Sequence, residues 1–117
     1  MRAELKRLHS PDVPNLVSWA PENKEFSILV QILVGPERSP GEESFDVTVC
    51  TPGWLSWRLE QEKVINARHH LIVAKYDYSQ LSNYLRTYVS SCEGETWQEV
   101  AHQLSRLGYW EFEDYVE

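Results

Sequence analysis

The spacing of apolar residues changes from strand-like in the first half of the chain to helix-like in the second half, and this change restricts the possible folds most. Residues 26–34 are mostly apolar at both odd and even positions, which is typical of a central strand covered on both faces. Residues 45–49 are apolar at every second position, which predicts a strand with one polar face. A turn-rich segment separates the two ranges, so an antiparallel hairpin is their simplest connection.

A further strand is predicted at the N-terminus, where residues 1–5 alternate between apolar and polar side chains. Leu8 breaks the alternation, which indicates a β-bulge. The segment 10–23 contains prolines among polar residues and is therefore expected to be a loop. The apolar residues expected to tether this loop to the body of the protein are Val13, Leu16, Val17 and Trp19.

Two amphipathic helices with capping-box signals are predicted in the second half of the chain. Asp77 and Gln80 mark the start of the first, and Thr96 and Glu99 mark the start of the second. Gly108 is placed to end the second helix. The apolar face of the first helix is expected to contain Leu81, Tyr84, Leu85, Tyr88, Val89 and Cys92. That of the second is expected to contain Trp97, Val100, Ala101, Leu104 and Leu107.

Three shorter elements complete the predicted order. Thr51 and Pro52 form a helix start signal, which predicts a short helix to about Glu60. Residues 67–76 predict another strand, and residues 109–117 allow a short edge strand. The residues of the short helix expected to face the core are Trp54, Leu55 and Leu59.

The order of these elements predicts an α+β fold, because strands cluster early and helices late. We expect a small, mostly antiparallel sheet of about four strands, with room for an extra C-terminal edge strand, packed by two or three helices. A chain of 117 residues has the length of one ordinary domain, so residues 1–117 are expected to form a single domain.

Acidic residues are concentrated towards the C-terminus. The chain has a formal net charge of −7, and residues 93–117 contain seven acidic residues and one basic residue, Arg106. A nucleic-acid-binding surface has the opposite sign, because it must neutralise phosphates. The charge therefore argues against nucleic acid as a partner and favours a basic protein.

The residues that could carry chemistry form no recognisable catalytic or metal-binding motif. His69 and His70 are neighbours on a predicted strand and point to opposite faces, so they are not expected to ligate one ion. Cys50 and Cys92 match no zinc spacing and are expected to be buried free thiols. We therefore expect no catalysis, cofactor or metal. An enzyme that uses either thiol with either of these histidines stays open as an alternative.

The N-terminal segment carries charges where a signal peptide would have its apolar core, and no apolar run approaches the length of a membrane span. A cytoplasmic protein with no membrane partner is therefore expected.

The acidic, aromatic C-terminal stretch is the expected point of contact with a protein partner, because acidic groups steer a basic partner and aromatic anchors supply binding energy. Trp110 and Phe112 are expected to pack in the core instead. A solvated tail that only keeps the protein soluble is the alternative. The expected contact residues are Glu93, Glu95, Tyr109, Glu111, Glu113, Asp114 and Tyr115.

Three segments of the sequence are ESFDVTVCTPGWL (43–55), RHHLIV (68–73) and SCEGETWQEVAHQLSRLGYWEFEDY (91–115). Together they resemble the immunity protein 8 family of bacterial polymorphic toxin systems. The resemblance spans nearly the whole chain, from AELKRLHSPD (3–12) onward, and it departs most in the loop 36–42.

The resemblance implies a protein that binds and neutralises the C-terminal domain of a cognate toxin, as in contact-dependent growth inhibition. It also implies an α+β fold and brings no catalytic residues and no small-molecule substrate. Together with the negative charge, it leads us to expect one basic toxin domain per immunity protein, and a nuclease fits that description. An adaptor or regulatory module that uses the same acidic face stays open as the alternative.

Overall fold

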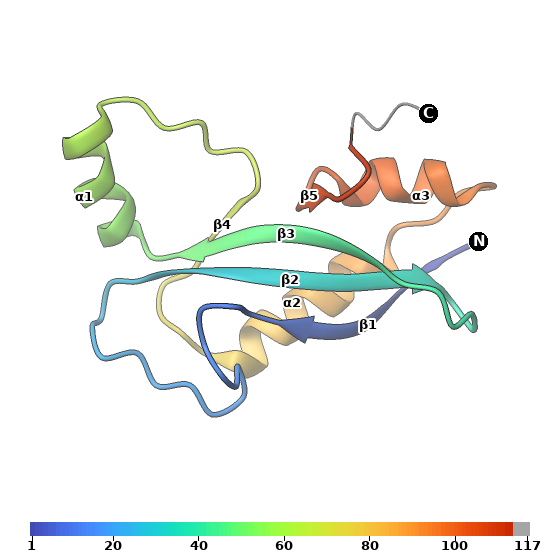
Figure 1. The fold of residues 1–117 in the computed structure, drawn as a ribbon, viewed down its shortest axis with the longest axis horizontal. Coiled ribbons are helices and arrows are strands. Elements are labelled where there is room, and N and C mark those ends of the chain that lie inside the picture. Colours follow the sequence, from blue (N-terminus) through green and yellow to red (C-terminus); the bar gives the residue numbers. More distant parts are fainter. Residues whose placement is uncertain (114–117) are drawn as a thin grey trace.

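The chain folds around one mixed, mostly antiparallel sheet, which confirms the predicted α+β class (Figure 1). The computed structural model describes residues 1–113. The strands of the sheet are β1 (Ala3–His9), β2 (Ser27–Pro36), β3 (Glu43–Cys50), β4 (His70–Ile72) and β5 (Tyr109–Trp110). The helices are α1 (Pro52–Glu62), α2 (Tyr78–Ser90) and α3 (Trp97–Leu104).

Strands β1, β2 and β3 form an antiparallel meander in that order, with β1 at one edge of the sheet (Figure 1). The predicted hairpin joins β2 to β3, with Ser27 opposite Cys50 and Val34 opposite Glu43. In β1 the pairing register shifts between Leu5 and Arg7. The predicted bulge is therefore present, but it lies before Leu8.

The outer edge of β3 is shared by two short strands. Strand β4 pairs in parallel with the end of β3 at Thr48–Cys50, and β5 pairs antiparallel with its beginning at Phe45–Asp46. Two segments that are distant in sequence are thus attached to one strand. Of the predicted strand 67–76, only the three residues of β4 pair with the sheet.

The hydrophobic core lies on one face of the sheet, between the strands and helices α2 and α3. Strand β2 alternates regularly between buried and half-buried residues. The expectation that both of its faces are covered is therefore wrong, because leucines such as Leu29 and Leu33 on the second face keep part of their surface exposed. The largest fully buried side chains of the sheet are Val30, Ile32, Val34, Phe45, Val47 and Val49.

Helices α2 and α3 begin at the predicted caps. The Asp77 side chain accepts a hydrogen bond from the backbone N–H of Gln80, and the Thr96 side chain accepts one from that of Glu99. Such caps satisfy backbone donors that have no partner within the helix. Most of the predicted apolar faces are buried, but Tyr84 is half exposed because it lies at the margin of the face that α2 turns to the sheet.

Helix α1 buries none of its residues and projects beyond the sheet at the end of β3 (Figure 1). The expectation that Trp54, Leu55 and Leu59 face the core is therefore wrong. The Thr51 side chain does not cap the helix either. Its hydroxyl oxygen accepts a hydrogen bond from the Phe26 N–H at 3.0 Å, which ties the start of α1 to β2.

The proline-rich loop before β2 is held by an aromatic cluster. Trp19 makes edge-to-face contacts with Phe26 and Tyr76, and the Tyr76 hydroxyl donates to the Leu16 carbonyl. Val17 was expected to tether this loop to the body of the protein, but its side chain is exposed, so that expectation is wrong. Within residues 1–113, no helix is long and apolar enough to cross a membrane.

Gly35 in β2 should be required for stability because the loop after β2 folds back against it. A Cβ atom at Gly35 would lie 1.8 Å from the Gly41 carbonyl oxygen, a backbone atom that cannot rotate away. We expect Gly35→Ala to lower the free energy of unfolding by about 1 to 3 kcal/mol, as overpacking does. Urea denaturation measures this change.

The matched control is Gly41→Ala, where the nearest atom to a new Cβ is the Ser39 hydroxyl at 4.0 Å. This variant should stay within about 0.5 kcal/mol of wild type. Equal stabilities for the two variants would contradict the packing described here.

Candidate functional site

A cleft with a volume of about 730 Å³ opens between α3 and the segment that follows β5. The beginning of β3 contributes Glu43 to its lining, and the loop that leads into β4 contributes Arg68. The lining residues are Glu43, Arg68, Trp97, Gln98, His102, Ser105, Trp110, Phe112 and Glu113. Aromatic and charged side chains from four parts of the chain therefore meet at one place.

Glu43 holds the two tryptophans of the cleft. Its Oε2 atom accepts a hydrogen bond from the Trp97 indole N–H at 2.7 Å and one from the Trp110 indole N–H at 2.9 Å. Hydrogen bonds to a carboxylate are stronger than those between neutral groups, so both rings are fixed in orientation. One side chain at the start of β3 thus links the first residue of α3 to β5.

The rings around Trp110 pack in the geometries that aromatic pairs prefer. Phe45 stacks beneath Trp110 with ring centroids 6.3 Å apart and an interplanar angle of 11°. Phe112 meets Trp110 edge to face at 6.0 Å, and His102 lies at the same distance on a tilted plane. Trp110 is half-buried against the core, as expected, whereas Phe112 is 40% exposed at the mouth of the cleft.

An ion pair between Arg68 and Glu113 forms the charged rim of the cleft, with an N–O distance of 2.5 Å. Arg68 is positioned by the next residue, His69, whose φ of 63° turns the backbone sharply. The His69 Nε2–H donates to the Ser105 carbonyl at 2.7 Å, which fastens this turn to the end of α3.

Three expected contact residues lie beside the cleft. Glu113 lines it, and Tyr109 is half exposed and touches the His69 ring edge to face. The Glu111 side chain accepts from the backbone N–H of Ser44 at 3.0 Å, so this carboxylate fastens the tail to β3. Asp114 and Tyr115 lie outside the described residues.

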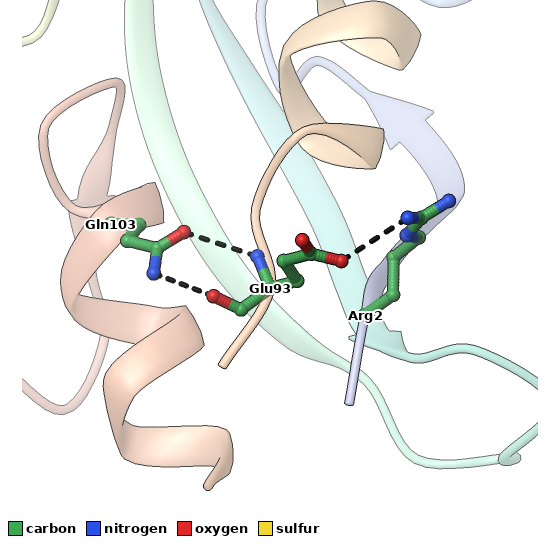
Figure 2. A network of polar contacts seen from close by, with 3 residues as sticks. All are labelled: Arg2, Glu93 and Gln103. Carbon is green, nitrogen blue, oxygen red and sulfur yellow. Dashed lines mark hydrogen bonds and ion pairs between the residues drawn. The ribbon is translucent and has the colours of Figure 1, made fainter. Parts of the chain in front are cut away.

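Glu93 and Glu95 lie in the turn before α3 and are not among the residues that line the cleft. The Glu93 carboxylate pairs with Arg2 at 3.1 Å, while the Gln103 side chain bonds both the N–H and the carbonyl of Glu93 (Figure 2). Glu93 therefore joins the N-terminus to α3, which is a structural role. Within the described part of the chain, the Glu95 carboxylate has no partner.

Asp46 lies in β3 opposite Tyr109, the first residue of β5. Its Oδ1 atom is buried and has no hydrogen-bond partner among residues 1–113. Burial raises the pKa of this carboxyl, the Glu111 charge adds to the rise, and Gln31 opposes it.

Comparison with models of protein families shows which family the chain belongs to. The family model described as Immunity protein 8 (Imm8) matches residues 3–115, which is nearly the whole chain. The chain belongs to this family. A search of curated proteins and a search of solved structures gave no significant match.

Membership of the immunity protein 8 family indicates that the chain binds and neutralises a toxin. The thiols of this Imm8 protein suit a packing role, because Cys50 and Cys92 are buried and burial raises the pKa of both. In the described structure, neither thiol is hydrogen-bonded to an imidazole, and no group of three or more His, Cys, Asp or Glu side chains could hold a metal ion.

The sequence alone did not point to Glu43, the residue that holds both tryptophans of the cleft. Glu43 resembles any other acid in a turn-rich loop, and its role follows from the pairing of β3 with β5, which no local pattern reveals. Trp97 was expected to be a core residue, and it does pack against the core while its N–H and one side of the ring line the cleft. Arg68 carried no signal because its partner, Glu113, is 45 residues away.

Removal of the Glu43 carboxylate should destabilise the Imm8 protein, because two indole N–H groups lose their acceptor. We expect Glu43→Ala to lower the free energy of unfolding by about 1 to 3 kcal/mol. Urea denaturation followed by tryptophan fluorescence measures the loss.

Glu42→Ala is the matched control, since Glu42 is the preceding residue and makes a surface ion pair with Arg7. This variant should change stability by less than about 0.5 kcal/mol. A loss in the Glu43 variant no larger than that in the Glu42 variant would contradict the role assigned to Glu43.

Asp46→Asn should stabilise the protein at neutral pH and not in acid. The pKa of Asp46 is higher in the folded than in the unfolded state, so wild-type stability falls as pH rises from the ordinary value of 3.8 through the folded value. The amide side chain of the variant carries no charge, so the variant does not lose stability in this way as pH rises. Below pH 3.8 the wild-type carboxyl is protonated in the folded and the unfolded state, so the substitution brings no such gain there. Urea denaturation at neutral pH and at about pH 3 tests the expectation. An equal gain at both pH values would contradict it.

Proposed function

We propose that this protein, acting as a single domain in the cytoplasm, neutralises one toxin domain by covering its active site or substrate-binding surface. The surface proposed for contact is the cleft face, which we define as the cleft lining together with Tyr109, Glu111 and Glu95. The family places the chain among toxin-neutralising proteins. The observation that supports this face is the convergence of tryptophan, phenylalanine and carboxylate side chains in one cleft.

The chemistry of the cleft face suits a protein partner. Trp, Tyr and Arg are the residues that most often dominate binding energy in interfaces, especially in pockets that exclude water. Trp97 and Trp110 are held rigidly by Glu43, so little side-chain freedom is lost when a partner arrives.

The charge of the chain favours a basic toxin, and a nuclease is the class that we propose. A nuclease must attract phosphates, so a carboxylate-rich surface can occupy the same positive field. Glu93 contributes less than its position in the sequence indicates, because Arg2 neutralises it. Glu95 keeps its charge available, and Glu113 shares its charge with Arg68.

Calorimetric titration with the toxin domain encoded beside this protein's gene tests the proposal directly. We expect a complex of one immunity protein with one toxin domain and a loss of toxin activity at that ratio. An absence of heat and of inhibition at low ionic strength would rule the proposal out.

The same titration with Glu95→Gln/Glu113→Gln tests the proposed face. Loss of two carboxylates there should weaken binding and flatten its dependence on salt, because the charges act through steering and close pairing. The matched control is Glu22→Gln/Glu60→Gln, which removes the same charge from exposed positions in the loop before β2 and on α1. Equal losses in both variants would mean that only net charge matters and would contradict the proposed face.

A further inference from the structure

We propose that the cleft receives an arginine side chain of the toxin domain, with the guanidinium between the aromatic rings and the Glu43 carboxylate. This inference rests on the proposed function, since it names the group that the toxin presents. Three observations support it: the tryptophans that line the cleft, the Glu43 and Glu113 carboxylates, and the existing contact between Arg68 and Glu113.

The walls of the cleft are suited to a planar cation. Trp97 and Trp110 line it from two elements, and Phe112 lines it next to Trp110. A guanidinium is attracted to the face of an aromatic ring and stacks on it, and tryptophan is the best partner for this contact. The bonds to Glu43 hold both indoles in place before the cation enters.

The carboxylates of the cleft supply the opposite charge. Both indoles bond the Oε2 atom of Glu43, and within residues 1–113 no donor bonds its Oε1 atom. Glu113 adds a second carboxylate whose side chain is only 17% exposed. Carboxylates that are partly removed from water bind a cation more strongly than those on an open surface. An anionic or apolar side chain would leave the Glu43 charge uncompensated, since Glu113 already pairs with Arg68.

Arg68 shows that the rim already accommodates a guanidinium. Its side chain is paired with Glu113 and is 55% exposed, so its charge is already matched and partly in contact with solvent. Apart from His102, the acidic and basic residues of the lining are Glu43, Arg68 and Glu113. The charge of Arg68 offsets that of Glu113, so the negative charge of Glu43 has no counter-charge among these residues. Arginine is preferred over lysine here because its flat group can stack on the indoles and also donate to Oε1.

The indole N–H resonances of the five tryptophans provide a site-resolved test in solution. The probes are N-acetylarginine amide, the neutral isostere N-acetylcitrulline amide and N-acetyllysine amide, titrated at constant ionic strength into the ¹⁵N-labelled full chain. We expect the arginine probe to shift the Trp97 and Trp110 signals in a saturable way in the millimolar range. The signals of Trp19, Trp54 and Trp57 are internal controls, because these rings lie outside the cleft lining.

Two variants complete the test. Glu43→Gln keeps an oxygen acceptor for the indoles and removes the charge, so it should abolish the shifts while the tryptophan signals stay dispersed. Glu42→Gln removes a neighbouring charge and should bind the arginine probe as wild type does. Equal shifts from citrulline or lysine amide, or an unchanged response in Glu43→Gln, would overturn the assignment of an arginine to the cleft.

Titration with the toxin domain distinguishes failure of the arginine contact from failure of the proposed function. If the toxin domain binds wild type, Glu43→Gln should weaken that complex roughly tenfold or more, as loss of a desolvated charge partner does. Tight binding that Glu43→Gln leaves unchanged would overturn the arginine contact while leaving neutralisation intact. Failure of wild type to bind the toxin would overturn the proposed function, whereas the probe titration would still report on the cleft.

Discussion

The structure depends on how the outer edge of β3 is divided. A strand edge offers backbone donors and acceptors that must be satisfied, and here β4 takes one end of β3 and β5 the other. Where β5 ends, the Glu111 side chain takes over and accepts the Ser44 N–H. This division brings the turn at His69 and the C-terminal segment to the same edge, and α3 closes the space between them. The cleft is the consequence of this arrangement.

Glu43 turns that arrangement into a defined surface. A carboxylate that accepts two indole N–H groups has a demanding geometry, because the donors come from α3 and β5 and the acceptor from β3. The cleft is therefore formed before any partner binds, which lowers the entropic cost of association. The proposed contact with a toxin domain would benefit from such a preformed surface, because less side-chain freedom is lost than in a surface that folds on contact.

Local signals predicted the parts of the fold that local interactions determine. The caps at Asp77 and Thr96 act within a few residues, and the alternation in β2 and β3 follows from the pleat of the strands. The site was less accessible, because Glu43 and Arg68 acquire their partners through strand pairing between distant segments. The acidic stretch was recognised as a feature, but its charges have separate uses: Glu93 holds Arg2, Glu111 holds β3, and Glu113 lines the cleft.

Helix α1 has a consequence for how such a protein can change over time. It buries none of its side chains. Trp57 on the helix is 58% exposed, and Val64, which follows the helix, is 81% exposed. Substitutions at its exposed positions alter surface chemistry at little cost to folding, whereas changes at the buried positions of α2 would disrupt the core. Mutation can therefore change the shape and charge of this part of the surface while the sheet and the cleft stay intact.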